Sequence, residues 1–112
     1  MKLFTDDSLS AAETASAFAA LGSEQRLAVL RCLVRAGAAG LRIGTLGERT
    51  GVTGSTLTHH LKILAQAGLI SQTKTGRSIQ CRVSYDRITA LSAYLMQECC
   101  ADRPLDESTR NG

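Results

Sequence analysis

Two groups of residues in this 112-residue chain could do chemistry. The first is a run of hydroxyl, imidazole and amino side chains between residues 53 and 62, and the second is a set of four cysteines. Hydroxyl and amino groups hydrogen-bond to phosphates and base edges, whereas thiolates bind soft ions. The polar run therefore indicates nucleic-acid binding, and the cysteines indicate a possible ligand site.

The polar run is predicted to form the outward face of a helix. Leu57, Leu61 and Leu64 recur every three or four residues, so they form an apolar stripe that attaches the helix to the protein body. Adjacent histidines project about 100° apart and lack an i,i+4 partner, which disfavours a metal site. The residues of this helix that we predict to contact DNA are Thr53, Ser55, Thr56, Thr58, His59, His60 and Lys62.

Apolar periodicity and turn residues predict four helices in the first part of the chain. They cover residues 10–21, residues 23 to about 36 with Ser23 as the N-cap, residues 43–50, and a fourth helix that ends at Gly68. Gly51 closes the third helix, and Thr53 or Ser55 caps the fourth. The segment 51–53 supplies the sharp bend of a helix-turn-helix.

After Gly68 the pattern changes to that of short strands. Residues 69–74 and 78–83 are β-prone, and residues 75–77 are the predicted hairpin tip, with Lys74 and Arg77 beside it as DNA contacts. A last helix, capped by Asp86, is expected to run to about Cys100. The predicted fold class is mainly α with a small β-hairpin wing, a winged helix-turn-helix over residues 1–101, followed by a polar tail over 102–112. A plain helical bundle with a polar surface helix is the alternative, and the joint presence of turn, polar face and basic hairpin disfavours it.

Charge and composition limit the function. The net charge is +3, but residues 21–88 carry ten basic and three acidic residues, net +7, between two ends that are each net −2. This distribution favours an anionic partner for the middle of the chain. No apolar run approaches the roughly 18 residues of a membrane span, and Asp6 and Asp7 interrupt the place of a secretory signal. We therefore expect a cytoplasmic protein with reduced cysteines and no membrane partner.

The segments Leu21–Leu27 and Thr45–Ile70 resemble the second-helix start and the recognition region of ArsR-family bacterial repressors. The resemblance covers about residues 9–101, and the stretch from His60-Leu61-Lys62 to Gly68-Leu69 is its most specific part. It implies a homodimer, paired through the first and last helices, that represses its own operon on double-stranded operator DNA until an effector binds.

The vicinal pair Cys99-Cys100 is the candidate effector site. Adjacent cysteines rarely bridge each other, and two such thiols can be ordinary small hydrophobic residues. Within the resembled family, sensor thiols are common, and the similarity is to arsenic sensors with a cysteine pair near the end of the last helix. That similarity implies a trivalent arsenical, arsenite or methylarsenite, as the effector at Cys99 and Cys100, with Cys81 as a possible third ligand. Cys81 is equally well explained as a buried core thiol, and no permanently bound cofactor is expected.

Three alternatives remain at this stage. Some members of the resembled family sense persulfide or oxidants through a second-helix and a last-helix cysteine, which here implies Cys32 with Cys99 or Cys100. A DNA-binding protein of the nucleoid type, without an effector, is the second alternative. An enzyme is the third and is disfavoured, because the chain offers a histidine pair but no base-orienting group or oxyanion site for a cysteine nucleophile.

Overall fold

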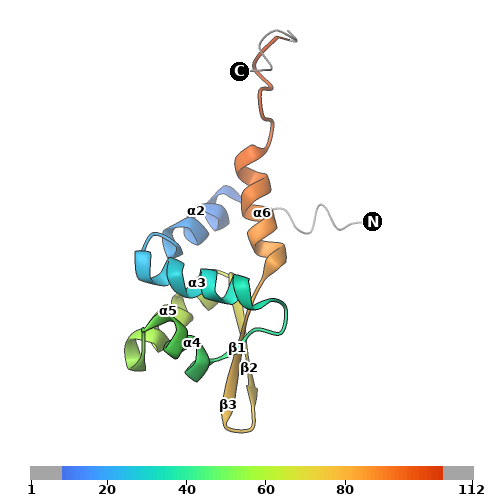
Figure 1. Cartoon of the computed structure of the whole chain (residues 1–112). Coiled ribbons are helices and arrows are strands. Elements are labelled where there is room, and N and C mark those ends of the chain that lie inside the picture. Colours follow the sequence, from blue (N-terminus) through green and yellow to red (C-terminus); the bar gives the residue numbers. More distant parts are fainter. Residues whose placement is uncertain (1–8, 105–112) are drawn as a thin grey trace.

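The computed structural model describes residues 9–104 (Figure 1). The predicted absence of a secretory signal and most of the predicted polar tail therefore lie outside the described residues. Along the chain the elements are α2 (Ala11–Ala20), α3 (Glu24–Ala36), β1 (Leu41–Arg42), α4 (Ile43–Thr50), α5 (Gly54–Gln66), β2 (Ile70–Thr75), β3 (Ser78–Val83) and α6 (Tyr85–Met96). The mainly helical class with a small β wing is confirmed.

Serine residues start three of the helices. The Ser10 hydroxyl accepts the Glu13 N–H, and the Glu13 carboxylate accepts the Ser10 N–H, which is a capping box at α2. Ser23 caps α3 as predicted, by accepting the Arg26 N–H. The prediction for α6 is wrong, because Ser84 accepts the Arg87 N–H, and Asp86 lies in the first turn. In the first turn, the negative charge of Asp86 interacts favourably with the positive end of the helix dipole, but its side chain does not cap the helix.

The last helix is shorter than predicted. It ends at Met96, and Gln97 leaves the helix with φ −56° and ψ 133°. Leu95 and Met96 are 65% and 64% exposed, so the final turn has no core of this subunit to pack against. Since short helices depend on tertiary packing, the prediction of a helix to Cys100 fails for lack of a packing partner.

The sheet contains one strand that the sequence did not reveal. Its order is β1-β3-β2, all antiparallel, with Leu41 opposite Cys81 and Gln72 opposite Cys81 on the other side. β1 has two residues, too few to show an alternating pattern. The predicted hairpin is confirmed with its bounds shifted by one residue, since β2 begins at Ile70 and includes Thr75.

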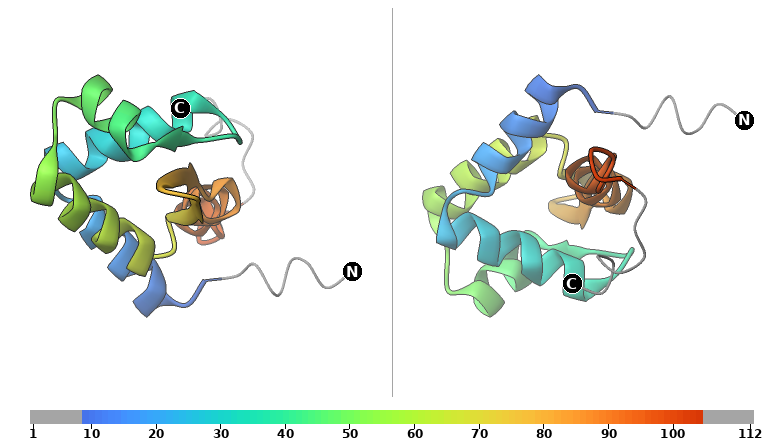
Figure 2. Two further views of the ribbon diagram at one scale, coloured as in Figure 1. Left: turned by 90° about the horizontal axis from the view of Figure 1, so that it is seen from below. Right: turned by 90° about the horizontal axis from the view of Figure 1, so that it is seen from above.

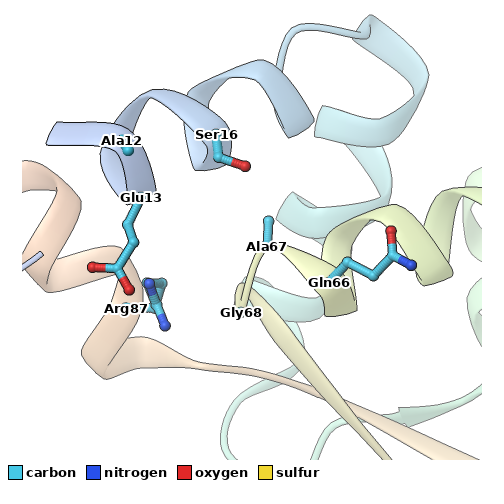
Figure 3. Close-up of a pocket in the computed structure, with 7 residues that line it drawn as sticks. All are labelled: Ala12, Glu13, Ser16, Gln66, Ala67, Gly68 and Arg87. Carbon is cyan, nitrogen blue, oxygen red and sulfur yellow. The ribbon is translucent and has the colours of Figure 1, made fainter. Parts of the chain in front are cut away.

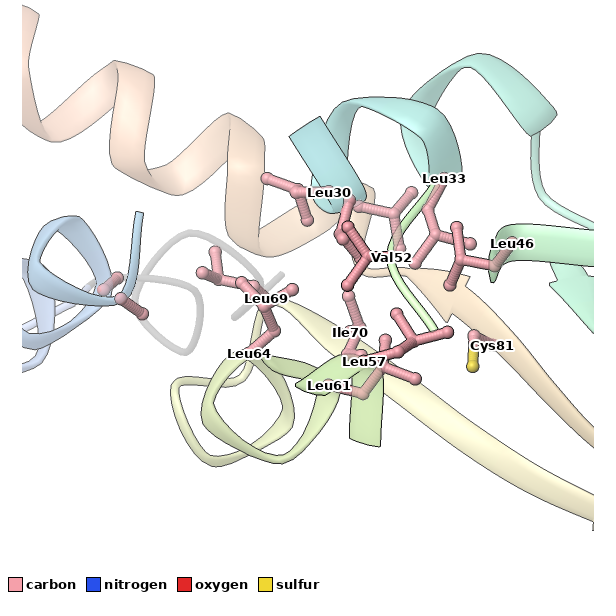
Figure 4. Packing of buried hydrophobic residues seen from close by; sticks show 14 of the residues in the cluster. Leu30, Leu33, Leu46, Val52, Leu57, Leu61, Leu64, Leu69, Ile70 and Cys81 are labelled. Carbon is pink, nitrogen blue, oxygen red and sulfur yellow. The ribbon is translucent and has the colours of Figure 1, made fainter. Parts of the chain in front are cut away.

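One apolar core holds the helices and the sheet together (Figure 4). Its largest fully buried side chains are Leu33, Leu46, Leu61, Leu64, Leu69, Val29 and Cys81. Helices α2 to α5 lie to one side of the molecule, and α6 stands with the hairpin on the other, as the views along α6 show (Figure 2). Over residues 9–104, no helix combines the length and apolar character that crossing a membrane requires.

Gly40 allows the chain before β1 to approach β3. Its φ is +75°, and a Cβ there would overlap the Cys81 carbonyl oxygen and lie 2.8 Å from Cγ of Arg82. Gly51 has a similar φ of +76°, but a Cβ there would meet nothing within 4 Å. A side chain at Gly40 would therefore cause both backbone strain and steric overlap, whereas a side chain at Gly51 would cause backbone strain alone.

We expect Gly40→Ala to lower the free energy of unfolding by at least about 3 kcal/mol, because strain and overlap add. Gly51→Ala carries the strain alone and should cost about 1–2 kcal/mol. Urea unfolding followed by circular dichroism measures both. Equal losses for the two variants would contradict the close approach of Gly40 to β3.

Candidate nucleic-acid interface

The turn between α4 and α5 is fixed by backbone and side-chain contacts. Gly51 adopts the left-handed conformation that ends α4, and its N–H donates to Gly47 O. The Thr50 hydroxyl donates to Leu46 O at 2.8 Å and accepts the Val52 N–H at 3.2 Å. Val52 is buried, so it attaches the turn to the core. This rigid turn sets the angle at which α5 leaves the body.

The start of α5 is exposed and free of negative charge. Thr53 occupies the N-cap position, but its side chain makes no capping hydrogen bond, and the first turn contains no acidic residue. Unsatisfied N–H groups at a helix start attract phosphate. The predicted DNA contacts that the structure leaves exposed on this helix are Thr53, Ser55, Thr56, Thr58, His59 and Lys62.

His60 differs from these residues. Its side chain is 8% exposed and lies with the buried face that Leu57, Leu61 and Leu64 form. Its Nε2 is 2.7 Å from Oε1 of Gln25 in α3. The prediction that His60 lies on the outward face is therefore wrong. His60 follows Leu57 by three residues and precedes Leu64 by four, so the helical period itself places it beside the apolar stripe. No local pattern reveals its partner, Gln25.

The wing, the hairpin of β2 and β3, extends beyond the helical body (Figure 1). Lys74 and Arg77, both predicted contacts, are exposed on either side of Gly76 at the tip. Arg82, which the sequence analysis did not select, donates from Nη1 to the Thr73 hydroxyl at 3.2 Å across the hairpin. A cavity of about 440 Å³ separates α5 from the wing, and Lys62 and Gln72 are among its lining residues.

Cys99 and Cys100 are exposed and lie side by side beyond the end of α6. Their Sγ atoms are 3.4 Å apart. The Ala101 N–H donates to Glu98 O, and Cys100 has φ +64°, so the two cysteines are the central residues of a type II turn. The hydrogen bond with Cys100, followed by charge repulsion from it, raises the pKa of the Cys99 thiol. The turn therefore holds two thiols close together in solvent.

The other two cysteines are not brought to this pair. Cys81 is fully buried in β3, where burial raises its pKa above the usual value despite a long contact from Gln72 Nε2 to its sulfur, 3.8 Å. Within residues 9–104, no group of three or more His, Cys, Asp or Glu side chains could hold a metal ion. Cys81 is therefore not a third ligand to the pair of its own subunit.

Cys32 also lies away from the pair. It is partly buried against the core in α3. The Tyr85 hydroxyl, in the first turn of α6, donates to Val34 O in the same part of α3. Twelve helical residues span about 18 Å, and the cysteine pair lies beyond the other end of α6. A disulfide needs Cα atoms within about 7 Å, so Cys32 cannot bridge to Cys99 or Cys100 within this subunit.

A second cavity, of about 310 Å³, lies where α2, the end of α5 and the start of α6 meet (Figure 3). The Glu13 carboxylate and the Arg87 guanidinium point toward each other there, and Arg87 contributes to a lowered pKa of Glu13 after the two Ser10 hydrogen bonds. A Cβ on Gly68 would lie 2.7 Å from the Arg87 guanidinium. The glycine thus leaves room for Arg87 to lie against the end of α5.

Comparisons with known proteins agree with this geometry. A family model described as a helix-turn-helix domain matches residues 21–73. The uncharacterized HTH-type transcriptional regulator YceK of Bacillus subtilis (strain 168) is 38% identical over 64 residues, 57% of this chain and 63% of that protein. The chain thus matches less than two thirds of that relative's length.

Two solved structures are similar along most of the chain. An ArsR-like transcriptional regulator from Rhodococcus sp. RHA1 is 32% identical with a TM-score of 0.68, covering 81% of this chain and 82% of that one. The homodimeric winged helix-turn-helix domain of Mb0332 from Mycobacterium bovis, a possible ArsR-family regulator, has a TM-score of 0.60 at 21% identity and covers 84% and 87% of the two chains. The second likeness concerns the fold alone.

Helix α5 follows the turn after α4 and packs on the body through one apolar face, and the β2–β3 hairpin with its basic tip lies beside it. This arrangement defines a winged helix-turn-helix protein of the DNA-binding class. The likeness to the Rhodococcus protein extends over both chains at more than 30% identity. The chain belongs to the ArsR family of transcriptional regulators.

The four thiols should differ in reactivity in the order of their exposure. A colorimetric disulfide reagent should react rapidly with the Cys99 and Cys100 thiols of the native protein, more slowly with Cys32, and with Cys81 only after unfolding. The double variant Cys99→Ser/Cys100→Ser should lose the fast phase and retain the others. A fast phase that survives in this variant would contradict the burial of Cys32 and Cys81.

Proposed function

We propose that this protein is a cytoplasmic repressor that binds operator DNA as a homodimer and is released when a trivalent arsenical binds Cys99 and Cys100. The observation that carries the effector assignment is the exposed thiol pair, 3.4 Å apart in one turn at the end of α6. DNA binding is supported by the exposed polar face of α5 and the basic wing.

In the proposed complex, α5 lies in the major groove of DNA and the wing contacts the DNA backbone. Ser55 and His59 lie on the side of α5 opposite its leucine stripe, where base edges are reached. Lys74 and Arg77 lie on the wing, where phosphates of an adjacent stretch of DNA are reached. Two copies related by a two-fold axis would place their α5 helices about one DNA turn apart.

Dimerisation is supported by the exposed apolar end of α6. Leu95 and Met96 are among the most exposed large hydrophobic side chains of the described residues. Large apolar side chains exposed side by side mark an interaction surface. The similar domain from Mycobacterium bovis is a homodimer. We therefore place the second subunit against the end of α6, next to the cysteine pair.

The chemistry of the pair favours an arsenical with one carbon substituent. Methylarsenous acid and two thiols condense to a methylarsenic dithiolate and two molecules of water, so that the methyl group fills the third position of the arsenic pyramid. Two sulfur donors leave methylarsenic with only carbon and sulfur substituents. Arsenite bound to the same two thiols would keep a hydroxyl group, because residues 9–104 provide no third donor near the pair. Forming two As–S bonds also removes the hydrogen bond with Cys100 and the charge repulsion from it, which together raise the pKa of Cys99.

We expect methylarsenite to release the protein from DNA taken from upstream of its own gene, weakening binding by roughly 5- to 150-fold, the range of typical allosteric coupling. Fluorescence anisotropy of labelled DNA measures this. The variant Cys99→Ser/Cys100→Ser should bind DNA equally well and no longer respond, while Cys32→Ser should respond as the parent does. Release of the double variant by the arsenical would contradict the assignment.

Parallel titrations separate the alternatives. Release by a persulfide donor, abolished in Cys32→Ser, would favour the redox sensor and would require a bridge between subunits. DNA binding that responds to neither compound would favour a DNA-binding protein without an effector. Arsenite that acts as strongly as methylarsenite would show that the methyl group is not required, so that a retained hydroxyl group or a donor from the partner subunit fills the third position on arsenic.

Leu95, in the last turn of α6, tests where the second subunit binds. Leu95→Glu should shift the protein from dimer to monomer in sedimentation velocity, because a carboxylate would be buried in the interface. Since two half-sites then bind independently, operator affinity should fall by at least about 100-fold. Ala93→Glu, an exposed position about 200° around the same helix from Leu95, is the control. A dimer that persists in Leu95→Glu would place the interface elsewhere.

A further inference from the structure

The buried face of α5 contains one polar side chain, His60. It lies one helical turn after Thr56 and beside Leu57 and Leu61, so it sits at the edge of the apolar stripe. Its Nε2 is 2.7 Å from Oε1 of Gln25, in the first turn of α3 and 35 positions earlier in the chain. This is a direct polar link between the DNA-reading helix and the helix on which it packs.

The hydrogen bond to Gln25 selects one tautomer of the neutral imidazole. An amide oxygen only accepts, so Nε2 of His60 must carry the hydrogen and donate to Gln25. The other ring nitrogen, Nδ1, is buried and has no hydrogen-bond partner among residues 9–104. A second proton would have to reside on Nδ1, where it would be a buried N–H without an acceptor and would carry a charge out of water.

The charged and titratable groups that face the ring also disfavour a cation. Arg26 approaches from α3 and His59 from α5, with the His59 and His60 ring centres 6.2 Å apart. Burial first, then the charges of Arg26 and His59, lower the pKa of His60. Neutral His60 is therefore part of the docked arrangement of α5.

We propose that neutral His60, hydrogen-bonded to Gln25, is a positioning residue that fixes the rotation of α5 about its own axis, and that protonation of Nδ1 releases this hold and weakens DNA binding. The inference rests on DNA reading by α5 and is independent of the arsenical. It assigns to His60 a different role from its neighbour His59, which faces solvent.

The sign of the pH effect follows from linkage. Because the docked state lowers the pKa of His60 below the value of about 6.5 of a free histidine, its contribution is fully present above pH 6.5 or so. It is lost progressively as pH falls from there to the docked pKa, and no further loss occurs below that.

Four variants test this by fluorescence anisotropy of upstream DNA between about pH 5 and pH 8, a range over which histidine titrates. His59→Gln removes the exposed imidazole and is the reference for the others, each made in that background. In it, affinity should fall several-fold toward pH 5. Adding His60→Gln keeps an N–H donor for Gln25 but cannot titrate, so the fall should disappear.

Substitutions of Gln25 should change the pH dependence of DNA affinity, which a purely structural role of His60 would leave unchanged. Gln25→Ala should weaken binding at pH 8 by roughly 3- to 10-fold, the worth of one hydrogen bond. Gln25→Glu offers a carboxylate to the imidazolium, so affinity should be retained or should rise as pH falls. Circular dichroism at each pH confirms that the variants are folded.

A pH profile that stays unchanged with His60→Gln would overturn the proposal, as would a fall toward pH 5 that persists in Gln25→Glu. Failure of the parent protein to bind DNA at any pH would instead remove the DNA-reading role of α5 on which the inference rests. A profile that flattens with His60→Gln and stays level or reverses with Gln25→Glu supports it.

Discussion

The burial of three leucines of α5 against the rest of the core determines how the chain presents its polar residues. Leu57, Leu61 and Leu64 are almost completely removed from water, and each such burial contributes roughly 1.5–3 kcal/mol. Since successive helical residues are about 100° apart, fixing this stripe also fixes the direction of Ser55 and His59 on the opposite side. The stripe therefore orients the whole face that is available to DNA.

The wing is held to the same core by its inner strand. Cys81 and Val83 of β3 are buried, and β3 lies between β1 and β2, so both neighbours add backbone hydrogen bonds to it. Gln80 donates from Nε2 to Ala39 O at 2.8 Å, which ties the loop before β1 to the hairpin. The tip itself is exposed, but its base is fixed relative to α4 and α5. The basic tip of the hairpin can therefore reach DNA while its position relative to α5 stays fixed.

Local patterns in the sequence predicted the order of the helices, the hairpin and the helix-turn-helix, because each depends on residues within a few positions of one another. The turn at Gly51 and the cap at Ser23 are of this kind. Two failures are non-local, since β1 exists only because β3 pairs with it and α6 stops where this subunit offers no further core. The inward position of His60 follows the helical period of Leu57, Leu61 and Leu64, whereas its partner Gln25, 35 positions away, lies beyond any local pattern. The exposure of the cysteine pair also depends on the early end of α6.

The thiol pair and the reading helix lie at opposite ends of α6, so the proposed release needs a mechanical connection. The start of α6 supplies one, since the Ser84 N–H donates to Leu69 O at 2.8 Å, just beyond the end of α5. Arg87, one turn further, lies directly against Gly68. A ligand that rearranges the turn at Cys99 acts first on Leu95 and Met96, where we place the partner subunit. Because the start of α6 is fixed to the end of α5, a shift between the two α6 helices must change the separation of the two reading helices.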